Sequence, residues 1–273
     1  MKKVLIIGEN SYLASDFELK NDAFSIVKTK RPFENNLEKY NDYDFIVNFC
    51  IQPEHFNRLL ADEEMIDYKI ARHIKNDKTK FVFLSSRKVY GSCTELKTYD
   101  ENSELKPFDF YSKNKCNIEQ KLTETLQPEQ LIILRTGNLI GKPSHRKNYG
   151  TFIGWIESEL KNNGKIVCTI NKNAKKDFIT KDYFQEVLKS VLEHNLEGIY
   201  NIGANFALST EELLKSILPE NYIEFSPKEK ESEQFILDCS KIYNFARKFT
   251  EEEFKIACSN LGELLLNKTK EHI

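Results

Sequence analysis

Tyr111 and Lys115 stand four positions apart and are the residues of this sequence best suited to transferring a proton. Residues at this spacing share one face of a helix, so the lysine ammonium can lie beside the phenol and favour its ionised form. A free phenol titrates at about 10, and it needs such help to exchange protons readily at neutral pH. The same pair would also suit the surface of a basic helix, because tyrosine and lysine are both common in this chain.

Two serines follow an apolar run in FVFLSSRKVYG, residues 81–91, and offer hydroxyl groups. A run of this kind predicts a buried strand, and Ser85 and Ser86 fall at its carboxyl end. Open α/β sheets bind their ligands at that edge, where a hydroxyl can hydrogen-bond a substrate carbonyl or alcohol. Serines also end strands for purely local reasons, so the position alone does not establish a site.

A single glycine, Gly8, follows the first apolar strand in VLIIGENSYLA, residues 4–14. The spacing to Ser11 and Ala14 matches a GxxGxxA dinucleotide-binding turn with serine in the place of the second glycine. Such a turn needs a tight bend at its first conserved position, close approach of the backbone to a pyrophosphate at its second, and close helix packing at its third. Gly8 and Ala14 meet these requirements, and Ser11 does so in part through its small size and its hydroxyl. An ordinary strand-to-helix turn is the alternative.

Strand-length apolar runs alternate with longer helical segments through the first half of the chain. This order predicts a doubly wound parallel α/β sheet of the Rossmann type, because most of the strands are apolar on both faces. The segment between the second and third strands is too short for a full helix, which predicts a sheet trimmed on that side. The expected strands are 3–7, 24–29, 45–50, 81–85 and 131–135, and the expected helices are 11–19, 55–76 and 110–126.

The composition changes after Gly141, where a basic and polar stretch, GKPSHRKNYG, begins. We therefore expect a dinucleotide-binding Rossmann domain over residues 1–141 and a smaller α/β substrate-binding lobe over 142–273, with segments near 175–205 returning to the core. Ser209 or Thr210 is a suitable N-cap for a helix in this lobe. The lobe's expected helices are 151–162, 177–194 and 208–218, and its expected strands are 165–170 and 198–203.

Bulk composition argues against several classes of function. The 40 basic and 42 acidic residues leave a net charge of −2, which favours neither nucleic acid nor an anionic membrane as a partner. The apolar run after Met1 ends at Ile7, too early for a signal peptide, and no run is long enough to span a bilayer. Scattered cysteines without a CxxC pair and histidines without a metal-binding spacing predict reduced thiols and no metal. We expect a soluble, cytoplasmic protein.

Taken together and in this order, the motifs resemble the extended short-chain dehydrogenase/reductase family, in its NAD-dependent epimerase/dehydratase group that modifies nucleotide sugars. The resemblance covers nearly the whole chain. SSRKVYG is similar to the family's serine strand, whose catalytic hydroxyl precedes the VYG tyrosine by four residues. PFDFYSKNKCNIEQKL (107–122) is similar to its catalytic helix, including the acidic residue that follows, here Glu119. Further similar segments are DFIVNFC (44–50), ILRTGNLIG (133–141), KKDFITKDY (175–183), GIYNIG (198–203) and LDCSK (237–241).

The resemblance implies a role for each matching residue. Tyr111 would be the catalytic acid/base, Lys115 would hold the nicotinamide ribose and favour the phenolate, and Ser86 would hydrogen-bond the reacting oxygen. Besides Tyr111 and Lys115, the implied cofactor contacts are Gly8, Asn10, Ser11, Tyr12, Leu13, Lys28, Lys30, Arg31, Asn48, Phe49 and Cys50. The implied substrate contacts are Ser86, Arg87, Asn138 and Arg146, and no metal is expected. The expected assembly is a homodimer formed through the helices at 55–76 and 110–126.

The segment VKTKRP, residues 27–32, bears on the choice of cofactor. Enzymes that select NAD usually place an acidic residue near the end of the second strand to bind the ribose 2′-hydroxyl, whereas a 2′-phosphate needs arginine or lysine. This basic segment therefore favours NADP(H). NAD(H) is the alternative if these lysines only form a solvated loop.

The two residues after Ser86 separate the reactions of this family. Its 4,6-dehydratases usually carry an aspartate and a glutamate there as a second acid/base pair, and this chain has Arg87 and Lys88. The sequence thus disfavours dehydration. It favours an NAD(P)H-dependent reductase of a nucleotide-linked 4-keto (deoxy) sugar that serves polysaccharide or glycan precursor synthesis. The alternatives are a nucleotide-sugar 4-epimerase that retains NAD and, more distantly, a non-catalytic cofactor-sensing module.

Overall fold

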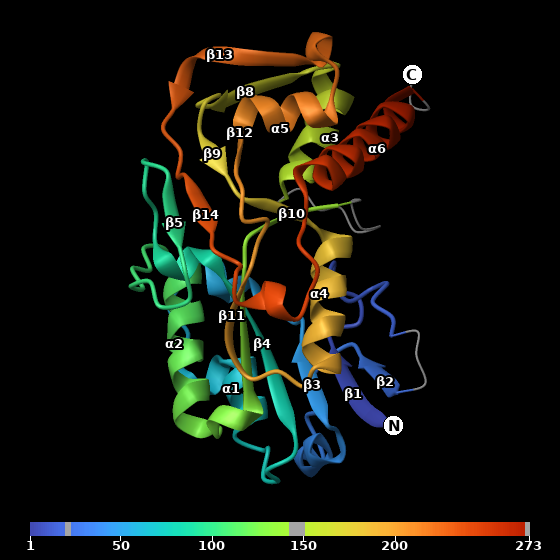
Figure 1. The fold of residues 1–273 in the computed structure, drawn as a ribbon, viewed down its shortest axis with the longest axis vertical. Coiled ribbons are helices and arrows are strands. Elements are labelled where there is room, and N and C mark those ends of the chain that lie inside the picture. Colours follow the sequence, from blue (N-terminus) through green and yellow to red (C-terminus); the bar gives the residue numbers. More distant parts are fainter. Residues whose placement is uncertain (20–22, 142–150, 271–273) are drawn as a thin grey trace.

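The computed structural model describes residues 1–19, 23–141 and 151–270 (Figure 1). Its centre is a six-stranded sheet in the order β11-β6-β4-β3-β1-β2, in which every neighbouring pair is parallel. This order confirms the Rossmann-type fold and the five strands predicted in the first half of the chain. The strands are β1 (Lys2–Ile7), β2 (Phe24–Thr29), β3 (Phe45–Asn48), β4 (Lys80–Ser86), β6 (Leu131–Thr136) and β11 (Gly198–Ile202).

Helices cover both faces of this sheet, as its two-sided apolar strands require. Leu5 and Ile7 of β1 belong to the core that includes side chains of α1 (Ile66–Ala71) and α2 (Phe110–Thr125). Val4 and Ile6, which point to the opposite side, belong to the core formed with α4 (Lys181–Glu193). In Figure 1, α2 lies to the left of the sheet, and α4 lies further right, near β3 and β1.

The helix predicted at 11–19 is absent, and residues 9–16 form consecutive turns instead. Backbone hydrogen bonds run from Ser11 N to Gly8 O at 2.8 Å and from Ala14 N to Ser11 O at 3.2 Å. Each joins residues three positions apart, which is the spacing of turns. The prediction was wrong because only residues 8–23 connect β1 to β2, and because the Ser11 hydroxyl accepts from Ala14 N at 3.3 Å and competes with the helical pattern. The turns nevertheless bury Ala14 in the core.

The single helix predicted at 55–76 is broken into three short pieces, and hydrogen bonds from a side chain of α2 explain the interruption. The side chain of Asn114 accepts a bond from Leu60 N at 2.9 Å and donates to His55 O at 3.1 Å and to Arg58 O at 2.8 Å. These backbone groups are thereby paired without a helix, a contact that sequence periodicity does not reveal. The three pieces are η2 (Pro53–Phe56), η3 (Asp62–Glu64) and α1.

The sheet is trimmed where the sequence predicts it. Only a short 3-10 helix, η1 (Leu37–Asp42), lies between β2 and β3, and β2 is an edge strand of the sheet. Tyr40 of this helix is buried, and its hydroxyl accepts from Phe33 N at 2.8 Å. One buried aromatic side chain therefore closes the core where a longer helix would otherwise pack.

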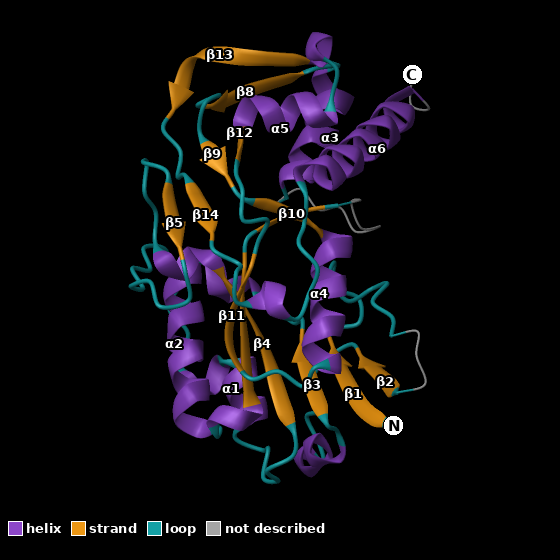
Figure 2. Ribbon diagram, in the orientation of Figure 1, coloured by secondary structure: helices purple, strands orange, loops and turns teal. Residues whose placement is uncertain are grey.

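The second lobe lies above the large sheet in Figure 2. The helices predicted near 151–162, 177–194 and 208–218 are all present, and Ser209 caps the last of them by accepting from Glu212 N at 3.1 Å. The C-terminal helix α6 (Glu251–Lys270), which packs on α5, was not predicted. The other elements of the lobe are α3 (Phe152–Asn163), α5 (Thr210–Ile217) and the parallel strands β8 (Ile166–Ile170) and β13 (Ile223–Lys230).

Two small sheets join the second lobe to the large sheet. β5 (Lys97–Tyr99) and β7 (Asn138–Ile140) follow strands of the large sheet along the chain, and both pair with strands from the C-terminal half. One small sheet has the order β12 (Leu208–Ser209), β9 (Lys175–Lys176), β14 (Phe235–Leu237), β5, and the other pairs β10 (Phe178–Thr180) with β7. The second lobe is thus held at the carboxyl edge of the large sheet. Within the described ranges, each helix is too short or too polar to cross a bilayer.

Candidate active site

The carboxyl end of β4 carries two serines whose side chains go different ways. The Ser85 hydroxyl points into the core and donates to the buried carboxylate of Glu119. Ser86 caps the 3-10 turn η4 (Arg87–Tyr90), its hydroxyl accepting from Lys88 N at 3.3 Å, and it is only partly buried. Of the two hydroxyls, that of Ser86 is therefore the one open to a ligand.

Tyr111 and Lys115 lie on the first turns of α2, beside the end of β4. Asp109 caps this helix, its carboxylate accepting from Ser112 N at 2.7 Å, and so determines where the turn that carries Tyr111 begins. The Lys115 ammonium donates to Leu84 O of β4 at 2.7 Å and lies 5.8 Å from the centre of the Tyr111 ring. The four-residue spacing thus brings a cation to the phenol.

A buried polar network lies behind Lys115, and sequence reasoning missed it. Asp67 is 3% exposed and accepts from Asn48 Nδ2 at 2.8 Å, and burial raises its pKa although the Lys115 charge opposes the shift. Burial and the same ammonium lower the pKa of His55 to about 4, so its imidazole is neutral at neutral pH. Asn48, an expected cofactor contact, is committed to Asp67 and to Cys50 N at 3.0 Å. No sequence spacing signals this network, because its members come from separate short elements.

Phe56 packs on the ring of Tyr111. The two rings are stacked, with centroids 5.0 Å apart and an angle of 1° between their planes. Phe56 is itself 56% exposed, so this contact lies near the surface of the site. Stacking of this kind holds the phenol in one orientation and limits the water around it. The sequence offered no signal for Phe56, since it ends η2, a short piece of the broken helix that shares no spacing with Tyr111.

The glycine turn packs against the end of β3, which brings together the expected cofactor contacts of both segments. Gly8 has a φ of 87°, and a Cβ atom added to it would lie 3.0 Å from both N and Sγ of Cys50. The chain at Phe49 is tied to β1, because its N–H donates to Ile7 O at 2.8 Å. Gly8 is therefore needed both for the bend and for the close approach of the two segments.

Substituting Gly8 with alanine is expected to weaken dinucleotide binding at least about tenfold and to destabilise the fold by about 1–3 kcal/mol, because the added methyl group meets the backbone of Phe49 and Cys50, just past β3, in a strained conformation. Fluorescence titration with NADPH and thermal unfolding measure the two effects. Gly164→Ala is the matched control, since Gly164 also has a positive φ but has no atom within 4 Å of the added Cβ. Equal effects of the two substitutions on binding would contradict the role of Gly8.

Side chains of α4 hold the turns that replace the predicted helix. Lys181 pairs with Asp16 and lies 4.9 Å from the centre of the Tyr12 ring, and Gln185 Nε2 donates to Leu13 O at 3.0 Å. Since no helix begins at this turn, a pyrophosphate bound here would meet amide groups of the turn and not the end of a helix dipole. Of the other expected contacts in these turns, Asn10 is exposed and Ser11 is partly buried.

The basic residues expected to meet a 2′-phosphate lie at and beyond the end of β2. The Lys28 ammonium donates to a backbone carbonyl of the turns at 3.4 Å, whereas Lys30 and Arg31 are exposed. Between them, Thr29 accepts from Gly8 N at 2.8 Å through its carbonyl, and its buried hydroxyl has no hydrogen-bond partner among the described residues. A buried hydroxyl without a partner beside a glycine turn fits the ribose of a dinucleotide.

The expected substrate contacts are not all brought to this site. Arg87 is buried, pairs with Glu233 and lies 4.2 Å from the centre of the Phe235 ring, so its guanidinium is committed to the second lobe. Asn138 begins β7 and is only partly buried, beside β10. Arg146 lies outside the described residues.

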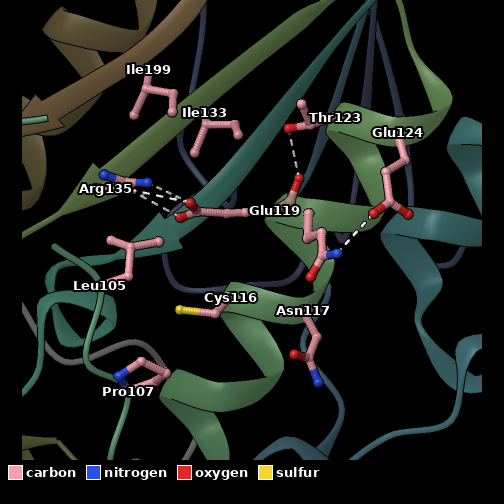
Figure 3. Close-up of a pocket in the computed structure, with 11 residues that line it drawn as sticks. Leu105, Pro107, Cys116, Asn117, Glu119, Thr123, Glu124, Ile133, Arg135 and Ile199 are labelled. Atoms are coloured by element: carbon pink, nitrogen blue, oxygen red, sulfur yellow. Dashed lines mark hydrogen bonds and ion pairs between the residues drawn. The ribbon is translucent and has the colours of Figure 1, made fainter. Parts of the chain in front are cut away.

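A cavity of about 570 Å³ opens elsewhere, along another face of α2 (Figure 3). Figure 3 shows Glu119 and Arg135 pointing toward each other in its wall, where their side chains pair at 2.7 Å. None of the expected catalytic or cofactor residues lines this cavity. Its lining residues are Leu105, Pro107, Cys116, Asn117, Glu119, Gln120, Thr123, Glu124, Ile133, Arg135 and Ile199.

Sequence comparison relates this chain to known enzymes. A sequence model of the NAD-dependent epimerase/dehydratase family matches residues 29–203, which is more than half of the chain. Among curated proteins, dTDP-D-glucose 4,6-dehydratase from Homo sapiens is 28% identical over 165 residues, which are 58% of this chain and 44% of that enzyme. The match thus spans less than half the length of this relative.

Solved structures share the fold over nearly the full length. A tyrosine-to-phenylalanine mutant of UDP-glucuronic acid 4-epimerase from Bacillus cereus, in complex with UDP-4-deoxy-4-fluoro-glucuronic acid and NAD, has a TM-score of 0.76 at 16% identity, and the match covers 97% of this chain and 99% of that one. RMD from Pseudomonas aeruginosa, complexed with NADPH, has a TM-score of 0.73 at 13% identity, with 98% of each chain covered. The family match confirms the resemblance first seen in the motifs, and the neighbours share the fold of this chain. The chain belongs to the NAD-dependent epimerase/dehydratase family, the nucleotide-sugar group of the extended short-chain dehydrogenases/reductases.

Proposed function

We propose that this enzyme reduces a nucleotide-linked 4-keto (deoxy) sugar with NAD(P)H and so makes a precursor for a polysaccharide or glycan. The observation that carries the proposal lies at the edge of the large sheet. There Tyr111 and Lys115 face the end of β4, which presents the Ser86 hydroxyl, and the next two residues, Arg87 and Lys88, are cations.

The three proposed catalytic side chains supply what proton transfer to a carbonyl oxygen requires. Ser86 holds the oxygen with its hydroxyl, and Tyr111 gives it a proton as the carbon is reduced. A bound nicotinamide supplies the hydride for that carbon. Lys115 stabilises the phenolate that remains, because its ammonium lies over the Tyr111 ring. Phe56, stacked on the same ring, keeps the phenol in place.

The turn after Ser86 argues against dehydration, although the human relative is a dehydratase. Elimination of water needs a second acid/base pair beside the sugar, and the corresponding residues here are Arg87 and Lys88. Both are ion-paired, Arg87 with Glu233 and Lys88 with Asp109 at 2.9 Å. A cation held by a carboxylate is a poor acceptor for the proton that elimination must remove.

We propose NADP(H) as the cofactor, because Lys30 and Arg31 are exposed just past the end of β2 and suit a 2′-phosphate. Replacing both with glutamate is expected to lower the preference for NADPH over NADH by about 10- to 100-fold, since charge-assisted bonds contribute about 1.5–3 kcal/mol each. Fluorescence titration with each nucleotide measures the ratio. Lys161→Glu, an exposed lysine of α3, is the control for charge alone. A wild-type enzyme that prefers NADH would refute the assignment.

A 4-epimerase that retains NAD is the second candidate. The unpaired, uncharged hydroxyl of Thr29 suits a ribose 2′-hydroxyl as well as it suits a neighbouring 2′-phosphate. The Bacillus cereus structure, a 4-epimerase in complex with NAD, adds support from the fold. Both reactions use the same proton transfer at Tyr111. They differ in whether the cofactor is consumed, as in the reductase, or retained, as in the epimerase.

One assay distinguishes these reactions. The purified enzyme is mixed with a panel of 4-keto nucleotide sugars and with NADPH, and both the nucleotide absorbance and the sugar products are followed. The reductase consumes NADPH in proportion to the sugar reduced. Interconversion of two nucleotide sugars without added cofactor would identify an epimerase instead. Turnover of any nucleotide sugar eliminates a non-catalytic cofactor-sensing module.

We also propose that the nucleotide sugar binds between the Rossmann domain, residues 1–141, and the lobe formed by residues 142–273, and that two copies pair through α1 and α2. Large apolar side chains are exposed near these helices, among them Leu59 and Phe110. Such side chains on one face suit an interface between subunits. Light scattering on the purified enzyme gives the mass that checks this assembly, and a monomer at micromolar concentration would contradict it.

A further inference from the structure

Lys88 lies between the two groups that we assign to the substrate oxygen. Its backbone N–H donates to Ser86 Oγ at 3.3 Å, and its ammonium lies 5.9 Å from the centre of the Tyr111 ring. The Lys115 ammonium lies at nearly the same distance, 5.8 Å, from that centre. Two ammonium groups therefore border one phenol, and only one of them belongs to the tyrosine-lysine pair.

The two ammonium groups differ in their exposure and in the hydrogen-bond partners that they already have. Lys115 is buried and donates to Leu84 O. The side chain of Lys88 is 36% exposed, and its one hydrogen bond within the described residues goes to Asp109 Oδ2 at 2.9 Å. An ammonium has three N–H donors, so two donors of Lys88 have no hydrogen-bond partner among the described residues, and the ammonium also lies 5.7 Å from the centre of the Phe108 ring.

Positive charge is in excess around Lys88. The guanidinium of Arg87 is already paired with the carboxylate of Glu233. Lys176 of β9 is partly buried, and its pKa is lowered by burial and by the charges of Arg87 and Lys88. Arg87 and Lys88 each have one carboxylate partner, Glu233 and Asp109, and Lys176 adds a third positive charge next to them. An anion brought by the substrate would relieve this repulsion.

We propose that Lys88 recognises a carboxylate carried by the sugar next to its reacting carbon, so that the preferred substrates are nucleotide-linked acidic sugars. This inference rests on the proposed function, which places the reacting carbon beside Tyr111. With the reacting carbon there, the Lys88 ammonium, 5.9 Å from the centre of the Tyr111 ring, can meet a charged substituent on the neighbouring carbon. A neutral sugar presents only hydroxyl or methyl groups to the ammonium and gains no charge-assisted bond.

The test compares the affinity of the full-length enzyme, with bound NADP⁺, for UDP-glucuronic acid and for UDP-glucose by calorimetry. The wild type is expected to bind the acidic ligand at least about tenfold more tightly. Lys88→Met is expected to remove most of this preference, and Lys88→Arg to keep it. Asp109→Asn is expected to increase it, because asparagine still caps α2 but no longer neutralises Lys88.

Several results would overturn the proposal. A wild type without preference for the acidic ligand contradicts it directly. Equal loss of affinity for both ligands and for UDP in Lys88→Met would assign Lys88 to the pyrophosphate or to folding. Lys113→Met, which removes an exposed charge from the same helix, must leave the preference intact. Because these are binding measurements, a Lys88-dependent preference in an enzyme that reduces no keto sugar would disprove the proposed reaction and not this recognition.

Discussion

Substituting Tyr111 with phenylalanine is expected to lower turnover by about 100- to 10,000-fold, the usual contribution of a positioned acid/base. The variant loses only the hydroxyl oxygen. Its ring can keep the stacked contact with Phe56 at 5.0 Å and the ammonium of Lys115 over its face. Proton transfer to the substrate oxygen then has to come from water, while the cofactor and sugar can still bind. Steady-state rates with a 4-keto nucleotide sugar and NADPH measure the loss.

Cofactor titration and thermal unfolding provide the controls for this variant. NADPH affinity is expected to change less than about threefold and stability by less than about 1 kcal/mol, since the phenol makes no hydrogen bond to another described residue. Tyr222→Phe, directly before β13 in the second lobe, is the matched control for removing a phenolic hydroxyl elsewhere. Turnover within tenfold of wild type in Tyr111→Phe would refute the acid/base assignment.

Substituting Glu119 with glutamine is expected to destabilise the fold by about 3–5 kcal/mol, because it leaves a buried guanidinium without its counter-charge. The side chains of Arg135 and Glu119 are only 4% and 6% exposed and pair at 2.7 Å. Arg135 also donates to the hydroxyl of Tyr90 at 3.1 Å, and Glu119 accepts from Ser85. The pair thus ties α2, β4 and β6 together behind the site. Urea unfolding followed by circular dichroism measures the change in free energy.

Two further variants test the origin of this effect. Glu124→Gln, on the exposed face of α2, removes a carboxylate from the same helix and is expected to change stability by less than about 0.5 kcal/mol. Combining Glu119→Leu with Arg135→Met is expected to cost less than the two single changes added together, because no charge is left unpaired. Additive losses would show that packing, and not the ion pair, determines the stability.

The central sheet was predictable because it depends on local patterns. Runs such as FVFL and LIIL are apolar on both faces, which is possible only for strands covered by helices on both sides. The short connection before β3 likewise predicted the trimmed edge. The helix at 11–19 failed because the connection to β2 is short and the Ser11 hydroxyl competes for Ala14 N, and the bond from Gln185 of α4 to Leu13 O then holds the turns. The helix at 55–76 failed because Asn114 of α2, distant in sequence, binds its backbone.

Part of the candidate site could also be predicted from the sequence. The spacing of Tyr111 and Lys115 placed an ammonium beside a phenol, and the strand pattern placed Ser86 at the same edge. The partners that surround them were not readable. Asp67, His55 and Phe56 come from short elements that share no period with α2, and the fold alone brings them to Lys115 and Tyr111.

The amino-acid sequence by itself determined the fold class, the trimmed sheet and the spacing of the proposed catalytic residues, because each follows from periodicity over a few neighbouring positions. Only the tertiary structure decided which charged side chains are buried in ion pairs and which remain available to a ligand. Arg87 is buried and paired with Glu233, 146 positions away, whereas Lys88 beside it remains partly exposed and lies 5.9 Å from the centre of the Tyr111 ring. Adjacent cations look equivalent along the chain, and burial together with a distant carboxylate makes them different.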